Sequence, residues 1–237
     1  MAKYVKYAIG EILLVVIGIL IALAINNWND ARKDRKSELR SLVDLHNEFS
    51  SNVIVFDSIL GLKKDIQKEQ EHIIEVIGNI LVHDSLKPNR RSRTGAVTFD
   101  PSQSVINSLL RTAKIDLIKN DSLKYMLTNW SDLLIDYKED EQWHTNFTQR
   151  ELYPYETKNL STHFYKYHPN DGHRSPFYSS SEVRSLYHKA FKDDEYRNLL
   201  LRNHQYLTMT IEEGDRIMKA MQHIITSLSN EIRARQK

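Results

Sequence analysis

Residues 7–30 read YAIGEILLVVIGILIALAINNWND, and this stretch decides the fold class. The run from Ala8 to Ile25 is apolar apart from Glu11. A helix rises about 1.5 Å per residue, so this run covers most of a hydrocarbon core of roughly 30 Å. We therefore predict one transmembrane helix, with residues 1–29 as the membrane anchor.

Aromatic residues flank the apolar run on both sides. Tyr4 and Tyr7 precede it and Trp28 follows it, and such residues gather at membrane interfaces. A cleaved signal peptide is the alternative interpretation, and it would have a shorter apolar region and an Ala-x-Ala-like cleavage site. The run ends instead in Asn-Asn-Trp-Asn at residues 26–29, which is a poor cleavage context. A retained helix is therefore expected.

Glu11 is the one charged residue inside the run, and a carboxylate in a membrane helix is costly and marks a candidate functional site. Spacings of three and four residues place it on one helix face with Val15, Gly18, Ala22, Asn26 and Asn29. Gly18 and Ala22 form a small-x-x-x-small pair, which lets two helices approach closely. We predict a helix-association face made of Glu11, Gly18, Ala22 and Asn26. The alternative is that Glu11 lies close enough to the Tyr7 end to reach headgroup water.

Two blocks of this sequence resemble a known family. Residues 7–30 resemble the opening of an uncharacterised family of bacterial single-pass membrane proteins that share a YAIGEI-x-LVVIGILIAL-x-INNWN signature. Residues 109–127, LLRTAKIDLIKNDSLKYML, resemble a second recurring block, in which members usually have Ser-Gly where this chain has Thr112-Ala113. The resemblance implies a membrane anchor followed by a helical domain, located in the bacterial inner membrane. It carries no assigned activity.

The membrane face of the domain is predicted differently by two arguments. Lys3 and Lys6 precede the anchor, whereas five basic residues follow it between Arg32 and Arg40, and the positive-inside rule then favours a cytoplasmic domain. Members of the resembling family tend to have longer basic N-terminal tails, which implies that the N-terminus is inside and the domain outside. Both faces stay open, and the resemblance tilts the expectation toward the periplasmic side.

The composition of the chain favours long helices. Gly and Pro number only 7 and 5 among 237 residues, whereas Leu, Ile, Lys and Glu are abundant. The net charge of +2 gives no basic field for nucleic acid, and the absence of Cys excludes disulfides and thiolate chemistry. We predict an all-α fold in which the anchor continues into a long helix to about Val82, within one long-helix bundle domain of residues 30–237.

Apolar residues recur three and four positions apart in three segments, which is the spacing of packed or coiled-coil helices. In the first long helix the spacing predicts a stripe that changes partway, from Leu42, His46, Phe49, Val53, Phe56 and Leu60 to Ile59, Leu62, Ile66, Glu69, Ile73, Val76 and Ile80. A helix capped by Asn120 or Asp121 should bury Leu123, Leu127, Trp130, Leu134 and Tyr137. A last helix from about Asp193 should bury Leu207, Ile211, Gly214, Met218, Met221, Ile225, Leu228 and Ile232.

The ends of these helices carry further expectations. Asp100-Pro101 is predicted to be an N-cap followed by proline, opening a short helix to about Arg111. If the last helix runs back along the first, then Arg233, Arg235 and Lys237 lie near the membrane and can touch anionic headgroups.

Two segments are predicted to be irregular. Residues 82–98 form a polar loop with Arg90, Arg91 and Arg93, which is either solvated or a phosphate or headgroup site. Residues 151–181 are rich in aromatics, proline and glycine, and form either a packed cap or a partner-binding loop.

A catalytic signature is not found in the sequence. Two Glu-x-x-His pairs, Glu69/His72 and Glu141/His144, match half of a dimetal carboxylate site, but such pairs also arise by chance. Loop residues His163, His168, Asp171 and His173 lack the regular spacing of structural zinc sites. Gly-rich phosphate loops, nucleophile elbows and His-Glu-x-x-His motifs do not occur. We predict that the protein is not an enzyme and has no catalytic residue, cofactor or metal.

The prediction for function is a membrane-anchored helical interaction or scaffold protein, as an accessory subunit of a membrane complex. Its partners would be the lipid bilayer and either further copies of the chain or another membrane protein, and not nucleic acid. An oligomeric pore lined by Glu11 is the first alternative. A dimetal enzyme that uses the two Glu-x-x-His pairs is the second.

Overall fold

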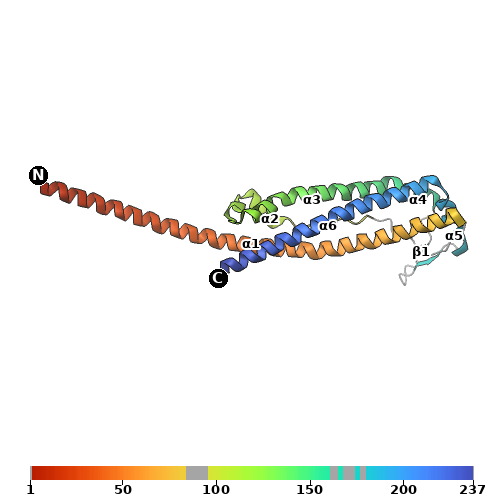
Figure 1. The fold of residues 1–237 in the computed structure, drawn as a ribbon, viewed down its shortest axis with the longest axis horizontal. Helices are drawn as coiled ribbons and strands as arrows, with labels where there is room; N and C mark the ends of the chain where they lie inside the picture. The colour runs from red at the N-terminus through yellow and green to blue at the C-terminus, as the bar shows by residue number, and fades with distance from the viewer. Residues whose placement is uncertain (1, 84–95, 161–164, 168–173, 177–179, 237) are drawn as a thin grey trace. The chain divides into compact units, whose positions relative to one another are not determined.

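The chain is almost entirely helical, as the sequence predicts (Figure 1). The computed structural model describes residues 2–83, 96–160, 165–167, 174–176 and 180–236, and the side chains of 13–80, 96–160 and 185–236. In chain order the elements are α1 (Ala2–His83), α2 (Ser104–Arg111), η1 (Lys114–Leu117), α3 (Asp121–Phe147), η2 (Thr148–Leu152), α4 (Tyr153–Asn159), β1 (Tyr165–Tyr167), β2 (Arg174–Pro176), α5 (Ser180–Phe191) and α6 (Asp194–Gln236).

Helix α1 runs without interruption for 82 residues. The first proline in the chain is Pro88, so nothing in this stretch removes a backbone donor from the helix. Its apolar segment is fully on the surface, with large side chains from Leu13 to Ile25 exposed by 47% to 75%. Among the described residues, α1 is the one helix long and apolar enough to cross a membrane.

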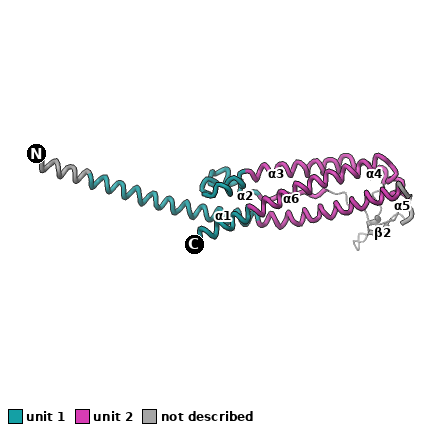
Figure 2. Tube along the Cα trace, in the orientation of Figure 1, with its two compact units in different colours: residues 1–49, 103–128, 224–237 teal, residues 50–102, 129–223 magenta. Residues whose placement is uncertain are grey.

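The chain divides into two compact units, each built from segments far apart in the sequence (Figure 2). Unit 1 comprises residues 1–49, 103–128 and 224–237, and unit 2 comprises residues 50–102 and 129–223. The predicted boundary between an anchor of residues 1–29 and a domain of residues 30–237 stays a prediction.

Unit 1 has an apolar core between the start of the amphipathic part of α1, the α2–η1 segment and the ends of α3 and α6. Its buried apolar side chains include Leu42, Leu45, Phe49, Ile106, Leu109, Ile115, Ile118, Leu123, Leu127, Ile224 and Leu228. Helix α6 runs antiparallel to α1 here, because Ser229 bonds His46 and Arg235 bonds Glu38.

Helix α2 begins later than predicted. Its N-cap is Gln103, which makes no side-chain capping bond, and Asp100-Pro101 lies before the helix. The free amides of its first turn are satisfied instead by α1: Glu48 accepts from the Val105 N–H at 2.9 Å and the Ile106 N–H at 3.1 Å. A carboxylate also complements the positive end of a helix dipole, so this contact replaces a local cap.

The turn after α2 passes through Ala113, whose φ of 54° is left-handed. This backbone region favours glycine, because a Cβ there crowds the following carbonyl. The turn is therefore made here by an alanine in a backbone conformation that glycine adopts more easily.

Unit 2 is centred on three aromatic rings. Phe56 lies 4.5 Å from Phe99 and 5.4 Å from Tyr137, measured between ring centroids. Gly214 of α6 faces this cluster, and a Cβ on it would lie 3.0 Å from Leu60 Cδ1 and 3.5 Å from Phe56 Cζ. Glycine therefore permits the close approach of α6 to α1 in this unit.

A second apolar cluster of unit 2 packs the last turns of α1 against η2, α4, α5 and the start of α6. It contains Ile73, Ile77, Ile80, Leu152, Tyr155, Leu160, Ala190, Phe191, Tyr196 and Leu200. The predicted irregular segment of residues 151–181 starts with ordered helix, because Pro154 lies in the first turn of α4, where proline is tolerated. Later it holds the antiparallel pair β1–β2, in which Lys166 faces Ser175.

Several predicted core positions are confirmed. All five residues proposed for α3 are buried, from Leu123 to Tyr137, and Asn120 caps α3 by accepting from the Leu123 N–H at 3.0 Å. In α6 the predicted stripe is buried as far as Met221, but Ile224 at 1% exposure takes the place of Ile225, which is only half-buried.

Candidate functional site

The predicted association face lies on the exposed part of α1. Nothing lies within 4 Å of a Cβ built on Gly18, and Asn26 donates to Asp30 at 3.2 Å. Trp28 is 59% exposed, with the Arg32 guanidinium 5.8 Å from its ring centroid. The predicted side chains of Glu11, Tyr4 and Tyr7 lie outside the described residues.

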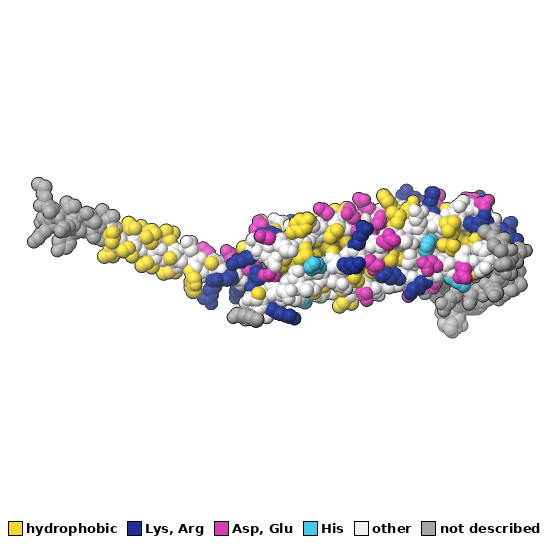
Figure 3. Space-filling view, in the orientation of Figure 1, with side chains coloured by type: hydrophobic (Ala, Val, Ile, Leu, Met, Phe, Trp, Pro, Cys, Tyr) yellow, Lys and Arg dark blue, Asp and Glu magenta, His cyan; other side chains and the backbone are white. Residues whose placement is uncertain are grey.

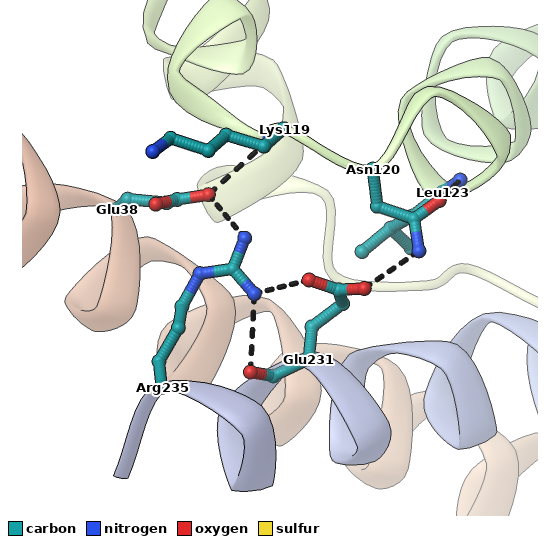
Figure 4. Close-up of polar contacts among 6 residues, drawn as sticks. All are labelled: Glu38, Lys119, Asn120, Leu123, Glu231 and Arg235. Carbon is teal, nitrogen blue, oxygen red and sulfur yellow. Dashed lines mark hydrogen bonds and ion pairs between the residues drawn. The ribbon is translucent and has the colours of Figure 1, made fainter. Parts of the chain in front are cut away.

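An arginine-centred network joins three elements of unit 1 (Figure 4). Arg235 of α6 donates from Nη2 to Glu38 Oε1 at 2.6 Å, and its Nη1 donates to the Glu231 carboxylate. Glu38 also accepts from the Lys119 backbone N–H at 3.2 Å. Glu231 in turn accepts from Asn120 Nδ2 at 2.6 Å, so the residue that caps α3 belongs to the same network.

The network shifts the pKa values of two of its members, Glu231 and Arg235. The Asn120 amide, followed by Arg235, holds the pKa of Glu231 below its usual value. The Glu38 carboxylate raises the pKa of Arg235. Arg235 therefore points into unit 1 and not to solvent, which differs from the prediction that it touches headgroups.

A basic pocket opens beside this network, between α1 and the α2–η1 segment of unit 1. It has a volume of about 580 Å³ and is lined by Lys33, Lys36, Ser37, Arg40, Ser41, Asp44, Ser104, Val105, Ser108, Leu109 and Lys114. Four lining residues are cationic and one is anionic. Figure 3 shows Lys and Arg side chains gathered where the apolar segment of α1 gives way to the rest of unit 1.

Unit 2 holds a buried ion pair that the sequence patterns did not reveal. Lys63 Nζ lies 2.9 Å from Glu141 Oε1, with both side chains at most 4% exposed. Glu141 also accepts from the Tyr137 hydroxyl at 2.6 Å and from the Phe99 backbone N–H at 3.1 Å. Burial lowers the pKa of Lys63, while the facing Glu141 carboxylate opposes that shift. Burial and the same carboxylate raise the pKa of Tyr137.

A polar layer follows one turn further along α3. His144 Nε2 lies 2.9 Å from Asn203 Oδ1, and the Thr148 hydroxyl donates to the His144 carbonyl at 2.8 Å. Burial lowers the pKa of His144 to about 4, so the ring is neutral at physiological pH. Gln70 is also buried, and neither its amide oxygen nor its nitrogen has a hydrogen-bond partner among the described residues.

The two Glu-x-x-His pairs do not come together as a dimetal site. Glu141 is held by Lys63, His144 is bonded to Asn203, and His72 is exposed beside Glu75, 3.9 Å away. Among the described residues there is no group of three or more His, Cys, Asp or Glu side chains placed to hold a metal ion. The loop residues His163, His168, Asp171 and His173, and the arginines Arg90, Arg91 and Arg93, have side chains outside the described parts of the chain.

A comparison with known families finds a match to part of the chain. The model of a family of unknown function, DUF6090, matches residues 11–132. The chain belongs to this family. The DUF6090 match begins at Glu11 and extends through α2, η1 and the first turns of α3, so it includes the lining of the basic pocket and Glu38 of the network. No curated protein and no solved structure matches the chain.

The DUF6090 match covers only part of the arginine-centred network. Glu38, Lys119 and Asn120 lie inside the matched range, whereas their partners Glu231 and Arg235 lie beyond it. Sequence reasoning placed Arg235 near the start of the domain but found neither Glu38 nor Glu231. One signal could have found Glu38: it lies four residues before Leu42, on the buried stripe of α1, where a carboxylate requires a partner.

Proposed function

We propose that this protein is a membrane-anchored helical scaffold, acting as an accessory subunit of a bacterial inner-membrane complex. The observation that supports this most strongly is the continuity of α1. One helix carries both the exposed apolar segment up to Ile25 and the core residues of unit 1 from Leu42 onward. An anchor of this kind passes into the core of unit 1 without a break in the helix.

The exposed apolar segment must be shielded from water. Its ten large side chains between Leu13 and Ile25 form a continuous surface, larger than the scattered apolar residues that soluble monomers expose. Each Å² of apolar surface removed from water contributes about 25 cal/mol. A bilayer provides that shielding, and partner helices in the bilayer would pack on the face that has the smallest side chains.

The predicted association face supplies the contact with partners. Gly18 and Ala22 let a second helix approach, and Glu11 on the same face can share hydrogen bonds with that helix or stay protonated. The partner is a second copy of this chain or another membrane protein. An association through this face distinguishes a scaffold from a protein that is only anchored.

Association can be measured in the membrane with three variants of the full chain. Gly18→Leu should disrupt association by bulk, and Glu11→Leu should weaken it by removing the polar contact. Ile17→Leu, a change of shape at constant volume on a neighbouring face, is the matched control and should associate like the parent. If all three variants associate as the parent does, the association face does not exist. Ion conductance in reconstituted vesicles would instead favour the pore lined by Glu11.

Membrane retention and the face of the domain need separate measurements. The chain should stay in the membrane fraction after carbonate extraction, and a mature protein that begins after Asn26 would contradict the anchor. The chain has no Cys, so a single Lys219→Cys variant carries a unique thiol for a membrane-impermeant maleimide. Labelling of intact spheroplasts indicates a periplasmic domain, and labelling only after lysis indicates a cytoplasmic one.

A further inference from the structure

The basic pocket of unit 1 has the chemistry of an anion site. Lys33, Lys36, Arg40 and Lys114 face one anionic residue, Asp44, and the lining also includes the hydroxyls of four serines. Lys33 pairs with Asp30 at 3.2 Å and Arg40 with Asp44 at 3.8 Å, but these side chains are 49% to 86% exposed. Pairs this exposed contribute little and exchange readily for another anion. Lys36 and Lys114 make no ion pair with any residue that the structure describes.

Backbone donors are not what would hold an anion in this pocket. The first amides of α2, at Val105 and Ile106, already donate to Glu48. A ligand must therefore be held by the ammonium, guanidinium and hydroxyl groups of the lining. Affinity that depends on charged side chains is sensitive to charge substitutions and to salt.

The position of the pocket along α1 indicates which anion it meets. A helix rises about 1.5 Å per residue, so Lys33 and Lys36 lie about 8 and 12 Å beyond Trp28. Side chains on a helix point back toward its N-terminus, and long basic side chains extend further toward water and headgroups. The headgroup layer is roughly 5–8 Å thick on each side of the hydrocarbon core, so these ammonium groups reach it.

The pocket also shares a side of α1 with the association face. Eighteen residues make about five turns, so Lys36 lies directly beyond Gly18 and Arg40 directly beyond Ala22. Because α1 is one helix throughout, the basic residues of the pocket project on the same side as the small residues of the apolar segment. A molecule whose apolar part lies along that side meets the four cations with its polar end.

We infer that the basic pocket binds the phosphate-bearing headgroup of an anionic phospholipid. This inference rests on the proposed membrane anchoring of α1. The lipid phosphate pairs with Lys36, Arg40 and Lys114, and the hydroxyls of Ser37, Ser41 and Ser108 donate to its remaining oxygens, because the Ser104 hydroxyl already donates to Glu48. A bound lipid would also fix the depth at which unit 1 meets the membrane.

The test uses the full chain, purified in mild detergent and titrated with lipid under native mass spectrometry. The parent should bind phosphatidylglycerol in preference to phosphatidylcholine. In the triple variant Lys36→Gln, Arg40→Gln, Lys114→Gln, affinity for phosphatidylglycerol should fall at least ten-fold, at roughly five-fold per lost charge near a membrane surface. Lys158→Gln, Lys189→Gln, Lys219→Gln removes the same charge from exposed sites in unit 2 and should bind as the parent does.

Further arms separate the possible outcomes. Equal affinity of the two triple variants for phosphatidylglycerol overturns the inference, and so does displacement of that lipid by millimolar inorganic phosphate, which would make soluble phosphate the ligand. If the pocket variant loses a co-purifying acidic protein but still binds phosphatidylglycerol as the parent does, the inference is overturned, and the ligand of the pocket is a protein. If the triple variant of the pocket fails to fold, two single variants replace it. Lys36→Gln should lower the affinity for phosphatidylglycerol about five-fold, whereas Lys36→Arg, which keeps the charge, should bind this lipid as the parent does. Carbonate extraction of the same variants tests the anchor separately, because a retained chain that binds no lipid contradicts only the pocket.

Discussion

Arg235 and Glu38 lie 197 positions apart in the chain and form an ion pair, with 2.6 Å between Arg235 Nη2 and Glu38 Oε1. The Glu38 side chain is only 3% exposed, and this arginine and the Lys119 amide are its hydrogen-bond donors. The last turns of α6 are thereby attached to the first core turn of α1. In unit 1, α1 and α6 are therefore held together by this ion pair as well as by the apolar core.

Removing this arginine should destabilise the fold. Arg235→Gln leaves a buried carboxylate without its cationic partner, and we expect a loss of about 2–3 kcal/mol in the free energy of unfolding. Chemical denaturation of the full chain in detergent measures it. Arg233→Gln removes an exposed arginine two residues away and should change stability by less than about 0.5 kcal/mol. Equal losses in the two variants would mean that the ion pair contributes nothing.

The buried Lys63–Glu141 pair in unit 2 predicts a strongly coupled double-mutant cycle. Lys63→Met leaves the buried Glu141 carboxyl group without its cationic partner, and should cost about 3–5 kcal/mol. Lys63→Met combined with Glu141→Gln removes both charges and keeps an acceptor for Tyr137 and Phe99, so the double variant should be more stable than Lys63→Met alone. Additive losses, measured by denaturant unfolding at pH 7, would show that the pair is not coupled.

His144 predicts a loss of stability in weak acid. Its ordinary pKa of 6.5 applies to the unfolded chain, whereas burial lowers the folded value to about 4. Between these values the unfolded chain binds more protons, so this contribution is fully present above pH 6.5 and is lost as the pH falls toward 4. The difference between the two pKa values corresponds to a contribution of roughly 3 kcal/mol to the free energy of unfolding. In His144→Gln the free energy of unfolding should depend less on pH over this window, and the exposed His223→Gln should behave as the parent does.

Ala113 gives a prediction of the opposite sign. Its left-handed φ of 54° strains an alanine and suits a glycine. Ala113→Gly should raise the thermal midpoint of unfolding. The expected gain in the free energy of unfolding is about 0.5–1 kcal/mol, after subtracting the cost of the greater conformational entropy that glycine has in the unfolded chain. Ala220→Gly, inside helix α6, should lower stability by about 1 kcal/mol. A thermal midpoint lowered by both changes would contradict the strained turn.

The long helices and most of their core positions were predictable, because they depend on local periodicity. The buried stripe of α1 was only partly predictable. It does not change partway but continues from Phe56 and Leu60 through Lys63, Ile66 and Gln70 to Ile73. A stripe predicted from apolar spacing omits Lys63 and Gln70, because both residues are polar. Nothing near Lys63 in the sequence indicates that it pairs with a carboxylate 78 residues away.

The candidate site was less predictable, for the same physical reason. The N-cap at Asn120 acts within its own segment and was found, whereas α2 is capped by Glu48, 57 residues before Val105. The basic residues after the apolar segment were visible in the sequence, but their pocket requires α2 and Lys114 to fold against α1. Positions that depend on distant partners are fixed by tertiary structure, and a single sequence does not display that pairing.

Helix α1 continues without a break from Ala2 to His83. The number of residues between Ala22 and Arg40 therefore sets the angle about the helix axis between these two side chains. One residue inserted after Asn29 would turn the proposed association face about 100° away from the basic pocket, and seven would return it to within about 20°. Length changes in this stretch should therefore be tolerated periodically, in steps of whole heptads. The core of unit 1 would keep its fold in every case, while the side of the apolar segment that lies in line with the basic pocket would change with each added residue.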